Sequence, residues 1–141
     1  MIIVTKNIDI FIYVISLYEF NDKDLEYSKN NTMKKSLSLF EKDINMDFLK
    51  EKPVLLVFTK KDILEDKREN DLSKEFLEYK GSSVDDEVNF IQKLYFSKII
   101  ELENRQIEYV YANLTRKDSF HLIEQKLNDI ISKNRIKYVT L

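Results

Sequence analysis

Residues 54–62 read Val-Leu-Leu-Val-Phe-Thr-Lys-Lys-Asp, an apolar run that ends in a polar tetrapeptide. The uninterrupted run Val54–Phe58 is typical of a strand buried on both faces of a parallel sheet. In open α/β sheets, ligands bind beyond the carboxyl ends of the strands. The polar residues Thr59–Asp62 therefore occupy a position where a ligand site is expected.

Two other segments have the composition of strands. Ile8–Ile15 is β-branched or aromatic almost throughout and predicts a second strand buried on both faces, whereas Ile107–Tyr111 predicts a third, more polar strand. Tyr109 and Tyr111 fall on one face of this third strand, because side chains alternate along a strand. We interpret these two tyrosines as packing residues and not as a platform for stacking bases.

Helical periodicity separates the strands. Apolar residues recur every three or four positions in Asp24–Phe48, in Val84–Glu103 and from Phe120 to Ile131, as they do on one face of a helix. Between them, Glu65–Ser83 is the most loop-like stretch. Strands that alternate with helices imply crossover connections and a parallel sheet with helices on both sides. We therefore predict an α/β fold with a three-stranded, largely parallel sheet and flanking helices.

Length and composition restrict the classes of function. With 141 residues, 43% hydrophobic and 34% charged, the chain is expected to form one globular domain, residues 1–141. A formal net charge of −2, with lysines that alternate with acids, gives no reason to expect a nucleic-acid partner. The apolar run Ile8–Leu17 is interrupted by Asp9 and is shorter than the roughly 20 residues of a membrane-spanning helix, so no transmembrane segment is predicted.

Residue counts also limit the available chemistry. The sequence has no cysteine and one histidine, His121, which excludes thiol catalysis, cysteine-based zinc sites and multi-histidine metal sites. It has one glycine, Gly81, whereas a phosphate-binding loop and the dinucleotide fingerprint each require at least two. We interpret His121 as a surface residue, and we predict no catalytic residue and no metal ligand in these 141 residues.

The tetrapeptide itself allows two interpretations. Guanine presents two N–H donors on one edge, and the two oxygens of the Asp62 carboxylate can accept from both, while the aliphatic stem of Lys60 covers the purine face. Adenine lacks that pair of donors. Alternatively, Asp62 is the N-cap of a helix that begins at Ile63. Four residues alone do not separate these readings.

The surroundings of the tetrapeptide resemble a known family. From Met1 to about Arg68 the chain resembles the alpha subunits of heterotrimeric G proteins without a gap, and Phe76–Gly81 and Asp129–Asn134 are similar to that family's Y-P-E-Y-x-G and D-x-I-I-x-x-N. Within the first region the matching positions are Phe20, Asn31, Met33, Ser36, Leu39, Phe40, Asn45 and Val54–Leu64. The resemblance implies the C-terminal half of a Ras-like, P-loop GTPase domain.

The resemblance also implies site residues. Thr59, Lys60 and Asp62 fall on the family's base-binding Asn-Lys-Lys-Asp, so GTP or GDP is the implied ligand. Ala112–Thr115 falls on Thr-Cys-Ala-Thr, which assigns the backbone N–H of Leu114 to the guanine O6. Thr59 replaces the family's asparagine, and Leu114 replaces its alanine. The implied receptor-facing tail residues are Ile136, Lys137, Tyr138 and Leu141.

In the family's sequence, the phosphate loop, the catalytic arginine, the magnesium-binding threonine and the switch glutamine precede the position of Met1. Because hydrolysis depends on those groups, we expect weak or absent nucleotide binding by these residues alone and an open hydrophobic edge at Ile8–Ile15. The inherited role is GTP binding and hydrolysis in receptor signalling. The alternatives are a non-enzymatic module that binds a receptor or effector, and a fragment without independent function.

The resemblance also implies binding partners and a cellular location. It implies a βγ dimer and a heptahelical receptor as partners. It also implies a cytoplasmic protein that reaches the inner face of the plasma membrane through those partners.

Overall fold

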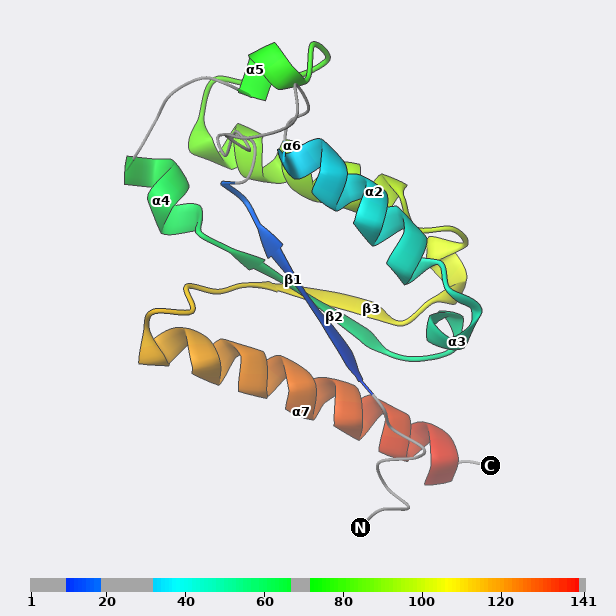
Figure 1. Cartoon of the computed structure of the whole chain (residues 1–141). Coiled ribbons are helices and arrows are strands. Elements are labelled where there is room, and N and C mark those ends of the chain that lie inside the picture. Colours follow the sequence, from blue (N-terminus) through cyan, green and yellow to red (C-terminus); the bar gives the residue numbers. More distant parts are fainter. Residues whose placement is uncertain (1–9, 19–31, 67–71, 140–141) are drawn as a thin grey trace. The chain divides into compact units, whose positions relative to one another are not determined.

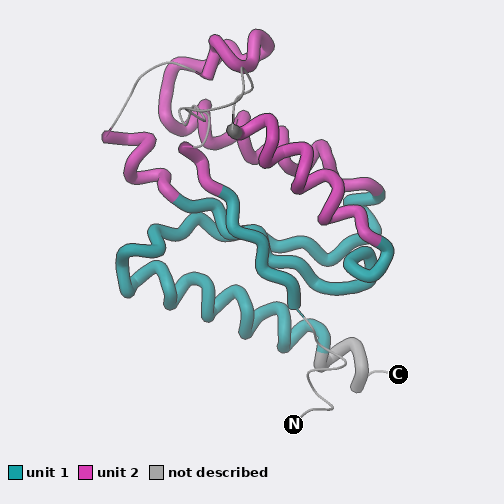
Figure 2. The backbone as a smooth tube through the Cα atoms, viewed as in Figure 1, with its two compact units in different colours: residues 1–15, 47–59, 101–141 teal, residues 16–46, 60–100 magenta. Residues whose placement is uncertain are grey.

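The computed structural model describes residues 10–18, 32–66 and 72–139, with the backbone alone at residue 32 and at residues 135–139. The chain divides into two compact units, each assembled from separated segments (Figure 2). The first unit comprises Met1–Ile15, Asp47–Thr59 and Glu101–Leu141, and the second comprises Ser16–Met46 and Lys60–Ile100. The single domain 1–141 stays a prediction.

The first unit is built on a three-stranded sheet in the order β1 (Phe11–Ser16), β2 (Val54–Thr59) and β3 (Ile107–Tyr111) (Figure 1). β2 and β3 are parallel, with Val54 opposite Ile107 and Phe58 opposite Tyr111. The N–H of Phe11 donates to Pro53 O at 3.0 Å, and the hydroxyl of Thr59 donates to Ile15 O at 3.3 Å. The starts and the ends of β1 and β2 therefore coincide, which confirms the predicted parallel sheet.

All six residues of β2 are buried. On one face, a core cluster joins β2 to β3 and to the helix α7 (Lys117–Val139), which covers this face (Figure 1). The buried members of the cluster are Leu55, Val57, Val110, Ala112 and Ile130. On the other face, the ring of Phe58 lies 5.5 Å from that of Tyr111 and 6.4 Å from that of Tyr109. The two tyrosines therefore pack against β2, as predicted.

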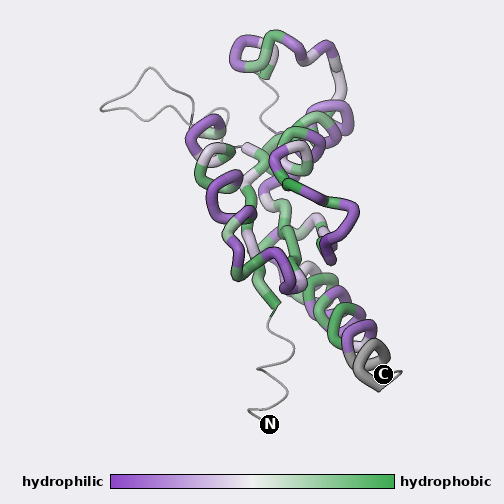
Figure 3. The backbone as a smooth tube through the Cα atoms, turned by 90° about the vertical axis from the view of Figure 1, so that its right-hand side faces the viewer, coloured by the Kyte–Doolittle hydropathy of each residue, from purple (hydrophilic) through white to green (hydrophobic). Residues whose placement is uncertain are grey.

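Hydrophobic and hydrophilic residues alternate along α7 (Figure 3), as the sequence predicts for an amphipathic helix. Ile123 and Leu127 pack on the core cluster beside Ile130. Phe120, however, is 54% exposed, so its assignment to the inward face is wrong. Ser119 is buried in its place, and its hydroxyl accepts a hydrogen bond from the N–H of Asn113 at 2.8 Å. A polar residue that bonds the preceding loop therefore takes the inward position at the start of the helix.

The first strand differs from its prediction. β1 lies at an edge of the described sheet, and Ile12 and Val14 are 50% and 53% exposed. Burial on both faces is therefore wrong for the described part of Ile8–Ile15, because Ile12 and Val14 lie on one face of the strand, and that face is exposed. The expected open hydrophobic edge is confirmed for these residues. Ile8 and Asp9 lie outside the described residues.

Two short elements complete the first unit: α3 (Asp47–Lys50) and the 3₁₀ turn η2 (Leu102–Asn104). Arg105, just after the turn, donates from Nη2 to Leu49 O at 3.2 Å, and burial lowers the pKa of its guanidinium. The rings of Phe11 and Phe48 meet edge to face at 5.7 Å. These contacts tie the start of β1 and the approach to β3 to α3.

On the face of β3 that packs against α7, Glu108 bridges two lysines of α7. Its carboxylate lies 2.7 Å from Lys133 Nζ and 3.5 Å from Lys126 Nζ. The hydrogen bond from Lys133 lowers the pKa of Glu108 and raises the pKa of Lys133. The ion pairs therefore join the strand to the helix along the border of their apolar contact.

The second unit contains α2 (Thr32–Ile44), α4 (Lys61–Asp66), α5 (Leu72–Glu75) and α6 (Val84–Ser97). α2 packs against α6, where the rings of Phe40 and Tyr95 meet edge to face at 5.1 Å. Just after α2, Asn45 donates from Nδ2 to Glu41 O at 2.7 Å and to Lys98 O at 2.8 Å. Its Oδ1 accepts from the N–H of Ile100 at 3.0 Å. One amide thus satisfies backbone groups at the ends of both helices.

Both long helices of this unit end before their predicted limits. α2 ends at Ile44 and not at Phe48, and α6 ends at Ser97 and not at Glu103. Asn45 bonds the chain just beyond both ends, and Glu101 takes a left-handed conformation with φ 55° that no helix continues. Phe20 and residues 24–31 of the predicted helix lie outside the described residues.

The described residues of the predicted loop Glu65–Ser83 contain more regular structure than its composition indicates. α4 continues to Asp66, and α5 lies within the segment. The rings of Phe76 and Tyr79 lie 5.7 Å and 5.2 Å from that of Phe90 on α6. Apolar anchors at three-residue spacing therefore hold this charged segment in the second unit.

α6 begins at Val84, as predicted, through a capping box. The N–H of Asp86 donates to Ser83 Oγ at 3.0 Å, and the N–H groups of Ser82 and Ser83 each donate to Asp86 Oδ2 at 3.1 Å. These backbone hydrogen bonds lower the pKa of Asp86. Both partners of the box satisfy backbone N–H groups that would otherwise lack an acceptor.

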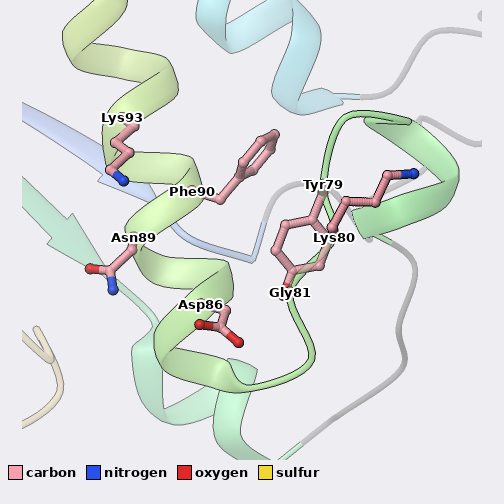
Figure 4. Close-up of a pocket in the computed structure, with 7 residues that line it drawn as sticks. All are labelled: Tyr79, Lys80, Gly81, Asp86, Asn89, Phe90 and Lys93. Atoms are coloured by element: carbon pink, nitrogen blue, oxygen red, sulfur yellow. The ribbon is translucent and has the colours of Figure 1, made fainter.

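Gly81 is enclosed by its neighbours at the edge of an open hollow of about 450 Å³ (Figure 4). The hollow is lined by Tyr79, Lys80, Gly81, Asp86, Asn89, Phe90 and Lys93. A Cβ atom on Gly81 would lie 2.5 Å from Asp86 Cβ and 2.6 Å from Tyr79 Oη. The capping box and the tyrosine ring leave no room for a side chain, which explains a glycine here.

We expect Gly81→Ala to destabilise the protein by about 1–3 kcal/mol, the usual cost of forcing extra atoms into a packed site. Urea unfolding followed by circular dichroism measures the change. Lys80→Ala, at the exposed neighbouring position, is the control and should change stability by less than about 0.5 kcal/mol. A Gly81→Ala variant as stable as the parent would show that the contact relaxes without cost.

We also expect Glu108 to make stability depend on pH. Because its folded-state pKa is lowered, its contribution is complete above the usual glutamate pKa of about 4.3 and is lost as the pH falls through the lower folded-state value. Urea unfolding at several pH values should show a shallower acid loss for Glu108→Gln than for the parent chain. Glu124→Gln, on the exposed side of α7, is the control. Equal slopes for the parent and Glu108→Gln would contradict this expectation.

Candidate functional site

The predicted site segment begins where β2 ends. Lys60 follows the strand with φ 66°, a left-handed conformation that costs a non-glycine residue about 1–3 kcal/mol. α4 starts at the next residue, Lys61, and the N–H of Leu64 donates to Lys60 O at 3.2 Å. The chain therefore passes from strand to helix in one residue, with the side chain of Lys60 exposed.

Asp62 lies in the first turn of α4 and is partly buried. The helix begins before it, so the interpretation of Asp62 as the N-cap of a helix starting at Ile63 is wrong. No group in the described part of the chain donates a hydrogen bond to the Asp62 carboxylate. The neighbouring Lys61 pairs with Asp85, with its Nζ 3.5 Å from Asp85 Oδ1. Within the described residues, the acceptor oxygens of Asp62 are uncommitted.

Thr59 is 6% exposed, and its hydroxyl donates to Ile15 O at 3.3 Å. The side chain is therefore directed along the sheet toward β1, away from solvent. At this position the hydroxyl braces two strands at their carboxyl ends, so Thr59 supports the segment that follows it.

The second predicted segment, Ala112–Thr115, begins beside the end of β2. The N–H of Ala112 donates to Phe58 O at 2.9 Å, which continues the hydrogen-bond pattern of β2 and β3 beyond the last paired residues. Leu114 is 41% exposed at the surface of the loop. The parallel sheet thus brings the loop containing Leu114 to the strand end that carries Thr59, as the carboxyl-end rule predicts.

The predicted site residues fall in both units (Figure 2). Thr59 and Leu114 belong to the first unit, and Lys60 and Asp62 belong to the second. Within the first unit, the loop that contains Leu114 begins beside the end of β2, and within the second unit Lys60 and Asp62 lie two residues apart at the start of α4. Of the predicted receptor-facing residues, Ile136, Lys137 and Tyr138 lie in α7, where the backbone alone is described, and Leu141 lies outside the described residues.

Two residues of the loop were not assigned a role from the sequence. Asn113 Oδ1 accepts from the N–H of Thr115 at 3.0 Å and from its hydroxyl at 2.6 Å, and Ser119 Oγ accepts from the N–H of Asn113. The order Asn-x-Thr is a signal for such a turn, because asparagine side chains bond the backbone two residues on. Ser119 has no comparable local signal.

The other features considered from the sequence are the single histidine, metal ligands and membrane-spanning helices. His121 is exposed, with Nδ1 at 3.8 Å from Glu124 Oε2. In residues 10–18, 32–66 and 72–134, no three histidine or acidic side chains are grouped so that they could hold a metal ion. Among the described helices, none combines the length and the apolar character needed to cross a membrane.

The fold and the strand-end loops define an α/β protein with a ligand-site position at the carboxyl edge of its parallel sheet. A family model described as "G-protein alpha subunit" matches residues 2–131. The guanine nucleotide-binding protein alpha-8 subunit of Dictyostelium discoideum is 32% identical over 126 residues, which cover 88% of this chain and 31% of that protein.

Two further relatives are similar over shorter or more divergent regions. The alpha-2 subunit of Caenorhabditis briggsae is 27% identical over 129 residues, 90% of this chain and 35% of that protein. The subunit alpha-15 of Rattus norvegicus is 36% identical over 93 residues, 64% of this chain and 25% of that protein. The chain belongs to the G-protein alpha subunit family, and it spans about a third of the length of the first two relatives.

We expect Thr59→Val to destabilise the protein by about 1 kcal/mol, because valine keeps the shape of threonine and leaves Ile15 O without its side-chain donor. Thermal unfolding measures the loss, and amide hydrogen exchange should show faster exchange in β1. Ser73→Ala, which removes an exposed hydroxyl, is the control. Unchanged exchange in β1 would contradict a bracing role for the hydroxyl.

Proposed function

We propose that this chain carries the guanine-recognising part of a G-protein alpha subunit and binds the base of GTP or GDP. The residues proposed for base recognition are Lys60 and Asp62 in the second unit, with Thr59 and Leu114 in the first. The observation that carries the proposal is the uncommitted carboxylate of Asp62, which follows the left-handed Lys60 at the end of a buried strand. Family membership supports the same assignment.

Each residue has a chemical role in this proposal. The two oxygens of Asp62 accept from the N1–H and the 2-amino group of guanine, which adenine cannot offer together. The aliphatic stem of Lys60 lies along the purine face. Thr59 supports the turn through its bond to Ile15 O, and the N–H of Leu114 donates to O6.

We assign no role in phosphate binding or GTP hydrolysis to the residues of this chain. The single glycine, Gly81, is packed against Tyr79 and Asp86 and is not part of a phosphate loop. The described residues do not fit a magnesium site, since no three of their histidine or acidic side chains are grouped so that they could hold a metal ion. GTP hydrolysis requires Mg²⁺, a charge-stabilising arginine and a positioned water, so we assign this chain base recognition alone.

The proposed partners follow from the family. A heptahelical receptor would contact Ile136, Lys137 and Tyr138 at the end of α7 and Leu141 beyond it, and a βγ dimer would bind elsewhere on the subunit. These partners would place the protein on the cytoplasmic side, at the inner face of the plasma membrane. The domain 1–141 would then be the C-terminal half of the GTPase domain.

A titration with a fluorescent GDP analogue carrying a methylanthraniloyl group on its ribose tests the base site. We expect a weak but saturable signal, because phosphate contacts supply much of the affinity in such proteins. Asp62→Ala should weaken binding at least tenfold, since two hydrogen bonds to a charged group are lost. Asp66→Ala removes an exposed carboxylate from the same helix and should leave binding within about twofold.

Three results would count against base recognition: no saturable signal, a signal equal in parent and Asp62→Ala, or equal competition by ADP and GDP. Recovery of the chain by a receptor in the absence of binding would favour the non-enzymatic interaction module. Circular dichroism without cooperative unfolding would favour a fragment without independent function.

A further inference from the structure

The residues that line the hollow beside Gly81 all belong to the second unit (Figure 4). Those of α6 are spaced three or four positions apart, which places them along one face of the helix: Asp86, Asn89, Phe90 and Lys93. Residues 79–81 line the hollow from the segment that precedes α6. Its volume of about 450 Å³ falls in the range of pockets that bind small molecules. None of the residues proposed for base recognition lines it.

Two aromatic side chains, Tyr79 and Phe90, supply the apolar part of the lining. Phe90 is half-buried, and its ring lies 5.7 Å from that of Phe76 and 5.2 Å from that of Tyr79. Gly81 is packed against the Tyr79 ring, since a Cβ atom on Gly81 would lie 2.6 Å from Tyr79 Oη. These contacts fix the orientation of the Phe90 ring, so its uncovered surface offers a planar ligand a preformed partner for stacking.

The charged residues of the lining leave one net positive charge. Lys80 and Lys93 are exposed and form no ion pair within the described part of the chain, whereas Asp86 contributes one carboxylate. Asp86 Oδ2 accepts from the backbone N–H groups of residues 82 and 83 at 3.1 Å each, so this carboxylate is already engaged at the start of α6. A monovalent anion therefore complements the lining, whereas a cation would meet two ammonium groups.

Solvent limits what this charge contributes. An exposed ion pair changes affinity by about fivefold at most, so an anion without an apolar body would bind poorly here. Asn89 precedes Lys93 by one helical turn, which brings its amide donor and the Lys93 ammonium to the same side of α6 (Figure 4). The lining thus combines donors for an anion with an aromatic surface.

We propose that the hollow binds a small aromatic monocarboxylate, with its ring on Phe90 and its carboxylate between Asn89 and Lys93. The single charge of a carboxylate matches the lining, while a phosphate monoester carries about −1.5 to −2 at pH 7. The inference goes beyond base recognition and does not depend on it, because the two sets of residues do not overlap.

The probe is 4-(trifluoromethyl)benzoate, titrated into the full chain and followed by fluorine NMR. We expect saturable binding at millimolar concentration, because a small ligand in an open pocket makes few contacts, and shifts of the backbone amide signals of residues 86–93. The uncharged 4-(trifluoromethyl)benzamide keeps the ring and lacks the charge, whereas acetate keeps the carboxylate and lacks the ring. Each should bind at least about threefold more weakly than the probe.

Lys93→Gln removes a charge at an exposed position and should weaken binding of the benzoate about fivefold. Phe90→Leu keeps an apolar side chain without a flat ring and should weaken binding about threefold. Circular dichroism checks the fold of both variants, and Lys93→Gln tests the site even if Phe90→Leu does not fold. Lys42→Gln, which removes an exposed lysine of α2 outside the hollow, is the matched control. Asp62→Ala should also bind the probe as the parent does.

Weaker binding in Lys93→Gln, with Lys42→Gln and Asp62→Ala equal to the parent, would support the site. Equal binding of the benzoate and the benzamide would overturn it, as would equal affinity in the parent and Lys93→Gln or the absence of saturable binding. Loss of binding in Asp62→Ala would overturn it too, since the probe would then occupy the base-recognition residues. Base recognition itself is tested by the GDP titration and stands or falls independently of these results.

Discussion

The complete burial of β2 is the constraint on which the first unit depends. All six side chains of Val54–Thr59 are buried, so the N–H and C=O groups of the strand need partners within the protein. β1 and β3 supply them on the two sides of the strand, and α7 covers the face that carries Leu55 and Val57. The polar residues begin where this burial ends, which places the exposed Lys60 at the carboxyl edge of the sheet.

Side-chain hydrogen bonds to the backbone shape both units at the ends of their elements. Asn45 satisfies groups at the ends of α2 and α6, Asp86 caps the start of α6, and Ser119 and Asn113 organise the turn before α7. A short polar side chain at such a point replaces bonds that a helix or strand no longer makes. A few asparagine, serine and aspartate residues therefore fix the backbone conformation at these helix ends and in this turn.

The sequence predicted the strands better than the ends of the helices. Apolar composition located β2 and β3 within one residue, because a buried strand requires an unbroken apolar run. Helix ends were placed too far along the chain, since apolar periodicity continues through Ile99 although Asn45 and the left-handed Glu101 end the helical geometry. The exposure of Ile12 and Val14 was missed for a similar reason, because composition does not distinguish an edge strand from a central one.

Local sequence by itself determined the α/β class, the β2 segment with its polar tetrapeptide, the start of α6 at its capping box and the family to which the chain is similar. These features depend on residue type and spacing over a few positions. Only the tertiary structure decided that Thr59 turns to Ile15 and that Ser119 and not Phe120 faces inward. Such outcomes depend on partners far apart in the chain, or on which of several local hydrogen bonds the packing allows.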